Sequence, residues 1–329
     1  MEFFNNIITE RKVIQKNFDG DHKKIIHIAF GIDANFALGM GVLMTSIILN
    51  NKNKQICFHV FTDALYQEDL DKLYELVELN NNTQICIYYL DKEAFAQLPT
   101  CFIWSHATYY RFIIGEELFG KVDKIIYLDS DVLCLKAIDG LLNLNFEDKI
   151  IMGVPDLPGM KEYAIQKLDF HGEHYFNAGV LYIDINKWKK EKIAEKAIEL
   201  LSKKNNYKFL DQDALNVLLI DKVLFVDKNY NCMYHLADMK TDISPNTVFV
   251  HFSGGTKPWQ RWSEGHFLVP LWMGYKEKSP WKDTPIVEAT SYKQAKYMAK
   301  AFQRKGCYDK FLVWYIKYSL WKIKEKLGL

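Results

Sequence analysis

Short apolar runs alternate with segments of helical periodicity between residues 25 and 260. The runs are rich in Ile, Val, Phe and Tyr and are bounded by polar residues, which is the pattern of strands buried inside a sheet. They predict strands at 25–30, 56–61, 84–90, 124–128, 149–154, 179–185, 223–226 and 247–252. The spacing between them predicts helices at 39–50, 67–80, 106–119, 187–204 and 211–220. This alternation favours an α/β fold with a mixed, mostly parallel sheet covered on both faces.

The same pattern divides the chain into three segments. Residues 1–24 are polar and show no periodicity, so we expect them to precede the fold as an N-terminal extension. Residues 25–265 carry the strands and helices of one α/β domain. Residues 266–329 are predicted to form a helical C-terminal segment that is rich in basic and aromatic residues.

Polar residues stand directly after several of the predicted strands. In parallel sheets, ligands bind beyond the carboxyl ends of the strands, where side chains from distant positions in the sequence meet. The sequence therefore predicts a polar site at one edge of the sheet. The residues expected there are Gly31, Asp33, Asn35, Asp129, Asp131, Asp156 and His251.

The apolar run KIIYL, at 124–128, ends abruptly at Asp129-Ser130-Asp131. If the extended backbone continues, the two carboxylates project to the same side, because side chains alternate with period two. Two hard oxygen ligands suit Mg²⁺ or Mn²⁺ bound to a diphosphate. The alternative is that the acidic pair caps a turn or a helix. The buried strand before it favours the metal site.

A second polar segment, VFVHFSGGTKPW at 248–259, contains two glycines and a lysine. Gly254 and Gly255 allow close approach of the backbone to phosphates, and Lys257 can neutralise their charge. His251 is a candidate third ligand of the same metal, although a histidine on a strand is also compatible with a core position.

Three other segments hold polar residues at places where they can reach the same edge. Asn177 precedes a predicted strand and can bind sugar hydroxyls, or else it forms part of a turn. Asp211 is either a helix N-cap, with Gln212 and Asp213 in the first turn, or a site residue. Arg111 lies on an apolar helix, so it needs an anionic partner, which is either a protein carboxylate or part of a ligand.

Taken together, six segments in this order resemble the family 8 retaining glycosyltransferases, most closely the bacterial lipopolysaccharide core glucosyl- and galactosyltransferases. The resemblance spans roughly residues 25–260. The segments are FGIDANF, TYYRF, YLDSDV, FNAGV, LDQDALN and HFSGGTKPW. One mild departure is Gly31-Ile32 in the first segment, where small residues such as alanine are common.

The resemblance implies a single Rossmann-like (GT-A type) nucleotide-sugar-binding domain over 25–265 that transfers glucose or galactose from a UDP-sugar to the lipopolysaccharide core. Mn²⁺ or Mg²⁺ would be held by Asp129, Asp131 and His251. The implied donor-binding residues are Gly31, Asp33, Asn35, Phe36, Arg111, Ser130, Asn177, Ala178, Asp211, Gln212, Gly254 and Lys257. Among these, Gln212, Asp211 and Lys257 are the candidates for catalysis, and Asp156 is the candidate for contact with the acceptor.

The implied chemistry leaves the route to retention open. It can proceed by double displacement through an enzyme nucleophile, or by attack of the acceptor on the face that the leaving UDP occupied. No matched position is an obvious carboxylate nucleophile, which favours the same-face route. Two other functions share these motifs: a UDP-sugar-binding module without catalysis, and a primer protein that glucosylates itself. A nucleotidyltransferase is a weaker alternative, because FGIDANF is not the glycine-rich loop that such enzymes use to bind phosphates.

Composition bears mainly on location and partners. The six cysteines form no CxxC pair, and neither a secretory signal nor a membrane-spanning run is recognisable, so we expect a cytoplasmic protein with reduced thiols. Net charge is +1, but ten Lys or Arg and two acids lie from residue 293 onward.

The end of the chain, 308–329, carries half of these basic residues on a predicted aromatic helix. Lys310, Lys317 and Lys324 recur every seven residues, among the aromatic residues Phe311, Trp314, Tyr315, Tyr318 and Trp321. This composition favours peripheral binding to an anionic membrane surface. The resemblance implies that this surface is the cytoplasmic face of the inner membrane. The alternative is packing on the rest of the chain or on another subunit, and nucleic-acid binding is disfavoured by the dominance of apolar residues.

Overall fold

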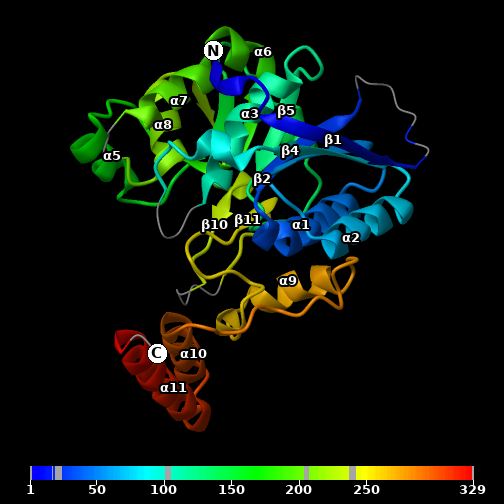
Figure 1. The fold of residues 1–329 in the computed structure, drawn as a ribbon. Coiled ribbons are helices and arrows are strands. Elements are labelled where there is room, and N and C mark those ends of the chain that lie inside the picture. The colour runs from blue at the N-terminus through cyan, green and yellow to red at the C-terminus, as the bar shows by residue number, and fades with distance from the viewer. Residues whose placement is uncertain are drawn as a thin grey trace. The chain divides into compact units, whose positions relative to one another are not determined.

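The chain forms two compact units (Figure 1). The first comprises Met1–Cys232 and Ser244–His251, and the second comprises Met233–Ile243 and Phe252–Leu329. The computed structural model describes residues 2–16, 18, 24–100, 105–203, 207–236 and 242–327. Cys101, one of the cysteines considered above, and the last two residues of the predicted tail lie outside the described residues.

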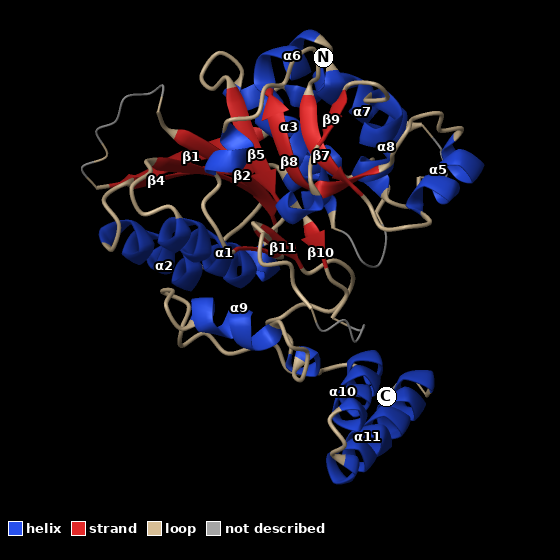
Figure 2. Cartoon of the chain, turned by 180° about the vertical axis from the view of Figure 1, so that it is seen from behind, coloured by secondary structure: helices blue, strands red, loops and turns tan. Residues whose placement is uncertain are grey.

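An eight-stranded mixed sheet forms the centre of the first unit (Figure 2). Its order is β1-β4-β3-β2-β5-β8-β7-β9. The β4-β3-β2-β5 block and the β7–β9 pair are parallel, whereas β1, and β8 with both of its neighbours, pair antiparallel. The strands are β1 (Ile8–Gln15), β2 (Ile26–Ile32), β3 (Ile56–Thr62), β4 (Thr83–Leu90), β5 (Lys124–Leu128), β7 (Ile151–Pro155), β8 (Phe176–Asp184) and β9 (Val223–Phe225). The predicted α/β class and the mixed sheet are confirmed.

Helices cover both faces of this sheet. Figure 1 shows α1 (Ala37–Asn50) and α2 (Gln67–Glu78) on one side. The other side carries α3 (Tyr110–Leu118), α6 (Ile185–Lys190), α7 (Ile193–Ser202) and α8 (Leu210–Leu218). Two short helices, α4 (Asp139–Leu142) and α5 (Met160–Leu168), lie in the connections. Burial on both faces explains why the strands read as continuous apolar runs: every residue of β3 is buried.

The helix expected at 187–204 is two helices. α6 ends before Lys192, which adopts φ +54° and precedes α7. A left-handed residue stops the helical hydrogen-bond pattern and turns the chain. The apolar periodicity continues on both sides of this break, so the periodicity alone predicts one helix.

The N-terminal segment is part of the sheet, which corrects the expectation that residues 1–24 precede the fold. β1 pairs antiparallel with β4 at the sheet edge. Its pattern was missed because, as an edge strand, it exposes most of its side chains, so alternation is weak. Arg11 also forms an ion pair with Glu117 of α3, at 2.8 Å.

A small second sheet holds the residues after β5. β6 (Val132–Cys134) pairs antiparallel with β11 (Phe249–His251), and β10 (Cys232–Met233) follows on the other side of β11. The segment expected at 247–252 is therefore a strand, but it belongs to this sheet and not to the central one.

The second unit is helical, with α9 (Val269–Lys276), α10 (Tyr292–Arg304) and α11 (Tyr308–Lys326). Its core contains tryptophans for which the sequence offered no role: Trp262, Trp272 and Trp281 are all buried. Trp262 packs with Ala289 and Met298, and Trp314 of α11 covers this cluster. The division at residue 252, in place of the expected 265, reflects this packing, because Trp259 already contacts Trp272.

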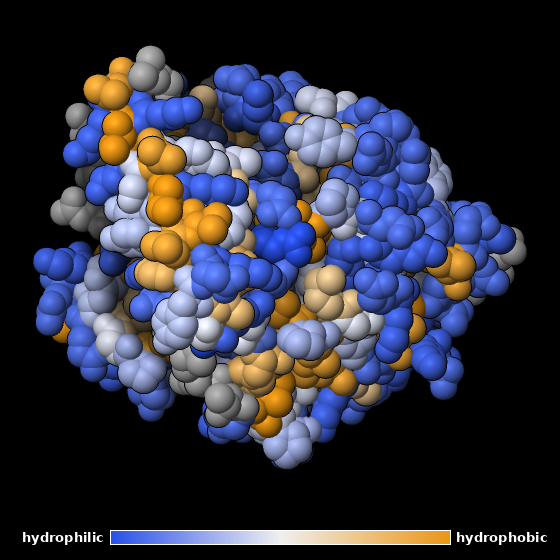
Figure 3. All heavy atoms as spheres, turned by 90° about the horizontal axis from the view of Figure 1, so that it is seen from below, coloured by the Kyte–Doolittle hydropathy of each residue, from blue (hydrophilic) through white to orange (hydrophobic). Residues whose placement is uncertain are grey.

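Helix α11 has two different faces. Phe311, Trp314, Tyr318 and Trp321 are half-buried. The opposite aliphatic stripe, defined here as Leu312, Ile316, Leu320, Ile323 and Leu327, is 50–66% exposed. Figure 3, which views the molecule from below, shows a row of apolar side chains among hydrophilic ones on these helices. No helix within the described residues is long and apolar enough to cross a membrane.

Candidate active site

The chain passes from the central sheet into the small sheet through Asp129-Ser130-Asp131. Asp129 follows β5 directly, and its backbone N–H donates to the Gly179 carbonyl of β8, at 2.8 Å. Asp131 precedes β6, whose first residue, Val132, pairs with His251 of β11. This antiparallel register brings the imidazole beside the acidic pair, although the two segments are more than a hundred residues apart in the sequence.

The three predicted metal ligands lie together. One ligand atom each from Asp129, Asp131 and His251 lies within 4.8 Å of the others. The His251 Nε2 atom is 3.3 Å from the Asp131 Oδ1 atom, and both side chains are buried. Two carboxylate oxygens and one imidazole nitrogen, converging at this separation, fit a hard or borderline divalent cation such as Mg²⁺ or Mn²⁺.

Gly179 makes room for this group, a role that sequence reasoning missed. A Cβ atom on Gly179 would lie 2.4 Å from His251 Cε1 and 2.9 Å from Asp129 Oδ2. Both separations are too short for real contacts, so any larger residue would displace two of the three candidate ligands. The glycine is therefore required by close approach and not by an unusual backbone angle.

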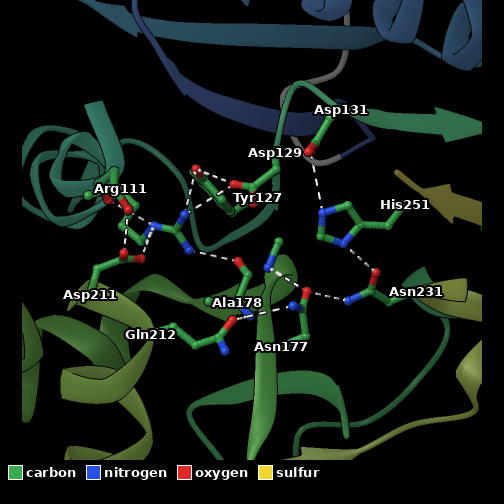
Figure 4. Close-up of polar contacts among 12 residues, drawn as sticks. Arg111, Tyr127, Asp129, Asp131, Asn177, Ala178, Asp211, Gln212, Asn231 and His251 are labelled. Atoms are coloured by element: carbon green, nitrogen blue, oxygen red, sulfur yellow. Dashed lines mark hydrogen bonds and ion pairs between the residues drawn. The ribbon is translucent and has the colours of Figure 1, made fainter. Parts of the chain in front are cut away.

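A chain of amides orients His251 (Figure 4). The His251 Nδ1 atom lies 3.0 Å from Asn231 Oδ1, and Asn231 Nδ2 donates to Asn177 Oδ1 at 2.9 Å. Because the Asn231 oxygen can only accept, the imidazole proton is placed on Nδ1, which leaves the lone pair of Nε2 facing Asp131. Asn231 lies in no recognisable motif, so sequence reasoning missed it.

Arg111 binds the protein's own carboxylates, which is one of the two kinds of anionic partner that its position on an apolar helix predicts. Its Nη2 donates to Asp129 Oδ1 at 3.1 Å, and its Nε lies 2.9 Å from Asp211 Oδ2. Tyr127, also missed from the sequence, stacks under the guanidinium with 4.3 Å to its ring centre and donates to Asp129. Nearby carboxylates raise the pKa of Arg111 despite its burial, so it stays charged.

Asp211 is not the N-cap of its helix. The cap position of α8 is Phe209, without a side-chain hydrogen bond, and Asp211 lies inside the first turn. Its carboxylate binds Arg111 and accepts a hydrogen bond from Thr108. Burial raises the pKa of Asp211 to about 6, an effect that Arg111 opposes. The helix start is instead tied by Asp213, which accepts from the Phe209 N–H at 2.9 Å.

Gln212, Asn177 and Asp156 form one network. Gln212 Nε2 donates to Asp156 Oδ2 at 2.9 Å, and Gln212 Oε1 accepts from the Ala178 N–H at 2.9 Å. Asn177 Nδ2 also donates to Asp156, at 3.2 Å. The predicted sugar and acceptor residues thus lie beside each other, at the start of β8 and the end of β7.

The residues expected to bind the nucleoside follow β2. Asp33 accepts from the Asn35 N–H at 3.0 Å and from the Ser105 hydroxyl at 2.7 Å, which fixes the short helix Ala34–Phe36. Gly31 allows α3 to approach, since a Cβ there would lie 3.1 Å from Tyr110 Cβ. Ser130 and Ala178 are buried, Asn35 is exposed, and Asp33 and Phe36 are half-buried.

Gly254 and Lys257 belong to the second unit and are described within it. Gly254 adopts φ +87°, a conformation that favours glycine, with His235 directly beside it. Lys257 Nζ donates to the Phe252 carbonyl at 3.0 Å, and its backbone N–H donates to Gln260 Oε1.

We predict that Gly179→Ala weakens Mn²⁺ binding by at least about tenfold, because the added methyl group displaces His251 and Asp129. Isothermal titration calorimetry with Mn²⁺ measures this. Gly274→Ala is the control, since a Cβ at Gly274 meets no atom within 4 Å. Unchanged affinity in Gly179→Ala would show that these three side chains are not the ligands.

Known proteins match this chain in sequence and in fold. The family model for glycosyl transferase family 8 matches residues 27–263, and the model for its C-terminal region matches residues 269–322. The lipopolysaccharide glucosyltransferase WaaO of Escherichia coli K12 is 32% identical, over 98% of this chain and 97% of that protein. The lipopolysaccharide 1,3-galactosyltransferase of Salmonella typhimurium LT2 is 34% identical, over 96% of this chain and 98% of that protein.

A solved structure agrees with the sequence relatives. The crystal structure of the galactosyltransferase LgtC with donor and acceptor sugar analogs aligns with a TM-score of 0.66 and 27% identity, covering 77% of this chain and 96% of LgtC. The family model covers most of the chain, and the two relatives align over nearly all of it. This chain is therefore a glycosyltransferase and belongs to glycosyl transferase family 8.

Proposed function

We propose that this glycosyltransferase moves glucose or galactose from a UDP-sugar to the core oligosaccharide of a bacterial lipopolysaccharide, with retention of the anomeric configuration. The observation that carries the proposal is the group formed by Asp129, Asp131 and His251, in a chain whose full-length relatives are lipopolysaccharide glucosyl- and galactosyltransferases. Diphosphates are bound in proteins through a divalent cation of the kind that this group fits.

The donor diphosphate would lie at the acidic pair. A bound Mn²⁺ or Mg²⁺ supplies positive charge that stabilises the leaving UDP. Asn231 holds His251 in the tautomer that can bind the cation, and Arg111 keeps Asp129 in place. Lys257 and the backbone at Gly254 would contact the phosphates and neutralise the charge that develops on them.

The nucleoside and the hexose would bind on either side of this point. Asp33, Asn35 and Phe36 would hold the uridine, with the Phe36 ring available to stack on the base. Asp211, Gln212 and Asn177 would bind the hydroxyls of the hexose, and Asp156 would contact the acceptor. The remaining donor-binding residues would be Gly31, Arg111, Ser130 and Ala178, of which Gly31 is half-buried and the other three are buried.

The contacts of the two nucleophile candidates favour the same-face route. The oxygen of Gln212 already accepts from the Ala178 N–H and from Asn177, and Asp211 is buried against Arg111. Neither the Gln212 oxygen nor the Asp211 carboxylate is oriented as a free nucleophile. In the same-face route, a phosphate oxygen of the donor would take the acceptor's proton as the acceptor attacks. We predict that mass spectrometry with a slow donor analogue finds no glycosyl-enzyme; a covalent adduct on Gln212 or Asp211 would contradict this route.

Two other functions remain to be distinguished by experiment. A UDP-sugar-binding module would bind the donor without turnover, and a self-glucosylating primer would gain hexose on its own tyrosines. The enzyme is favoured because every position of the ligand group holds a side chain that can bind a metal, in a chain whose full-length relatives are glucosyl- and galactosyltransferases.

Helix α11 would place the enzyme at the membrane that carries its acceptor. Lysines follow both edges of the aliphatic stripe: Lys310, Lys317 and Lys324 on one side, and Lys322 and Lys326 on the other. An exposed apolar stripe flanked by lysines fits the surface of an anionic bilayer, where each basic residue contributes on the order of 1 kcal/mol. The aromatic residues of the helix mostly pack inward, so the membrane contact would be aliphatic.

We predict that UDP-glucose or UDP-galactose is turned over in the presence of Mn²⁺, as measured by UDP release with a panel of sugar nucleotides. Asp131→Asn should lower the rate by at least about a hundredfold, because it removes a charged ligand beside the diphosphate. Asp139→Asn, a surface carboxylate paired with Lys54, is the control. Metal-dependent binding without turnover, even with a lipopolysaccharide core acceptor, would favour the binding module.

We also predict that the double variant Ile316→Ser, Leu320→Ser floats less with anionic liposomes than the unchanged enzyme does, because it interrupts the aliphatic stripe. Release of UDP in solution should be unaffected. Leu79→Ser, which replaces a leucine that is 71% exposed on the first unit, is the control. Equal flotation of both variants would exclude this face as the membrane contact.

A further inference from the structure

A second cluster of metal-ligand side chains lies on the central sheet, far along the strands from the acidic pair. His27 of β2 pairs with Cys57 of β3, and His59 of β3 pairs with Cys86 of β4. Because side chains alternate with period two, Cys57 and His59 share one face of the sheet. His27 and Cys57 are each the second residue of their strand, whereas Asp129 follows the carboxyl end of β5.

The side chains of this cluster converge. One ligand atom each from His27, Cys57 and His59 lies within 4.8 Å of the others. His27 Nδ1 is 3.0 Å from His59 Nε2, and Cys57 Sγ is 3.8 Å from Cys86 Sγ. In a tetrahedral zinc site, bond lengths of about 2.0 Å to nitrogen and 2.3 Å to sulfur place neighbouring donors roughly 3.3–3.8 Å apart. The spacing of the cluster is therefore close to that of a zinc site.

The outer contacts of the cluster orient its donors. His59 Nδ1 lies 3.1 Å from the Tyr88 hydroxyl, so the tyrosine fixes the ring with Nε2 turned toward His27. Two N–H groups cannot face each other at 3.0 Å, and so at least one of the two facing nitrogens carries a lone pair. Outer hydrogen bonds of this kind accompany histidine ligands in metal sites.

A purely structural role for this cluster would be unfavourable, because burial removes its polar side chains from water. Cys57 and His59 are 2% and 4% exposed, in a sheet whose neighbouring positions are filled by Ile, Val and Phe. An apolar side chain at position 59 would serve packing equally well and would avoid the desolvation of an imidazole. Binding a cation would offset the free-energy cost of burying these polar side chains.

We propose that His27, Cys57 and His59 bind a borderline-soft divalent transition metal, Zn²⁺ in the first place, at a site separate from the acidic group. The thiolate and two imidazoles select such a metal over Mg²⁺ or Ca²⁺, which prefer oxygen ligands. Cys86 is the candidate for the fourth ligand, after rotation of its side chain toward the histidines. The bound ion would tie β2 to β3 at the start of both strands.

Cobalt substitution tests this site independently of glycosyl transfer. The reduced, metal-free enzyme is titrated with Co²⁺, and absorption in the near ultraviolet reports a cobalt–thiolate bond. We expect this band in the unchanged enzyme and its loss on addition of Zn²⁺. Cys57→Ser should lower the band by at least about half, because it removes one thiolate and leaves only Cys86 as a possible sulfur ligand, whereas Cys134→Ser, at a buried thiol of β6, should keep it in full. Asp131→Asn should also keep it, because the acidic group contains no thiolate.

A second variant guards against misfolding of Cys57→Ser. His27 is half-buried, and His27→Gln should weaken cobalt binding by at least about tenfold while circular dichroism stays unchanged. Zn²⁺ should raise the temperature of thermal unfolding of the unchanged enzyme and of Asp131→Asn, but not that of His27→Gln. Absence of the cobalt band, an undiminished band in Cys57→Ser, or equal binding by His27→Gln would each overturn the proposal.

Discussion

The arrangement of the site depends on how buried negative charge is compensated. Asp129, Asp131 and Asp211 lie close together in buried or half-buried positions, and Arg111 contacts the first and last of them. Buried carboxylates cost several kcal/mol each unless a cation or hydrogen bonds compensate them. Arg111 therefore fixes Asp129 from the protein side and Asp211 beside the expected sugar. Asp131 faces His251, where a divalent cation would supply the remaining positive charge.

The two sheets make this compensation possible. The central sheet positions Asp129 at the end of β5, and the small sheet positions His251 by pairing β11 with β6. Gly179 of β8 keeps the space between them open, and Asn231 sets the proton on His251. Each contribution comes from a different part of the chain. The geometry of the three candidate ligands therefore depends on correct folding of the whole first unit. The proposed zinc cluster lies on the same sheet, but its donors are suited to a softer metal.

Residues that terminate buried strands could be predicted from the sequence, because an apolar run that stops at a charged residue marks a strand end. Asp129, Asp131, Asp156 and His251 were found in this way. Asn231 and Gly179 could not be, since their roles follow from antiparallel register and from close approach across strands. Strand β1 could not be predicted because an edge strand lacks a strong pattern. The cluster of His27, Cys57 and His59 could not be predicted either, because it depends on the pairing of β2 with β3.

The central claim is that Asp129, Asp131 and His251 hold a divalent cation against the diphosphate of a UDP-sugar. Electron paramagnetic resonance of Mn²⁺ tests it directly, because the signal of free Mn²⁺ falls as the ion binds. The account predicts that UDP strengthens Mn²⁺ binding by at least about tenfold, through the shared ligands of ion and diphosphate, and that Asp131→Asn abolishes this coupling. Mn²⁺ binding that is independent of UDP, or that is unchanged in Asp131→Asn, would contradict it.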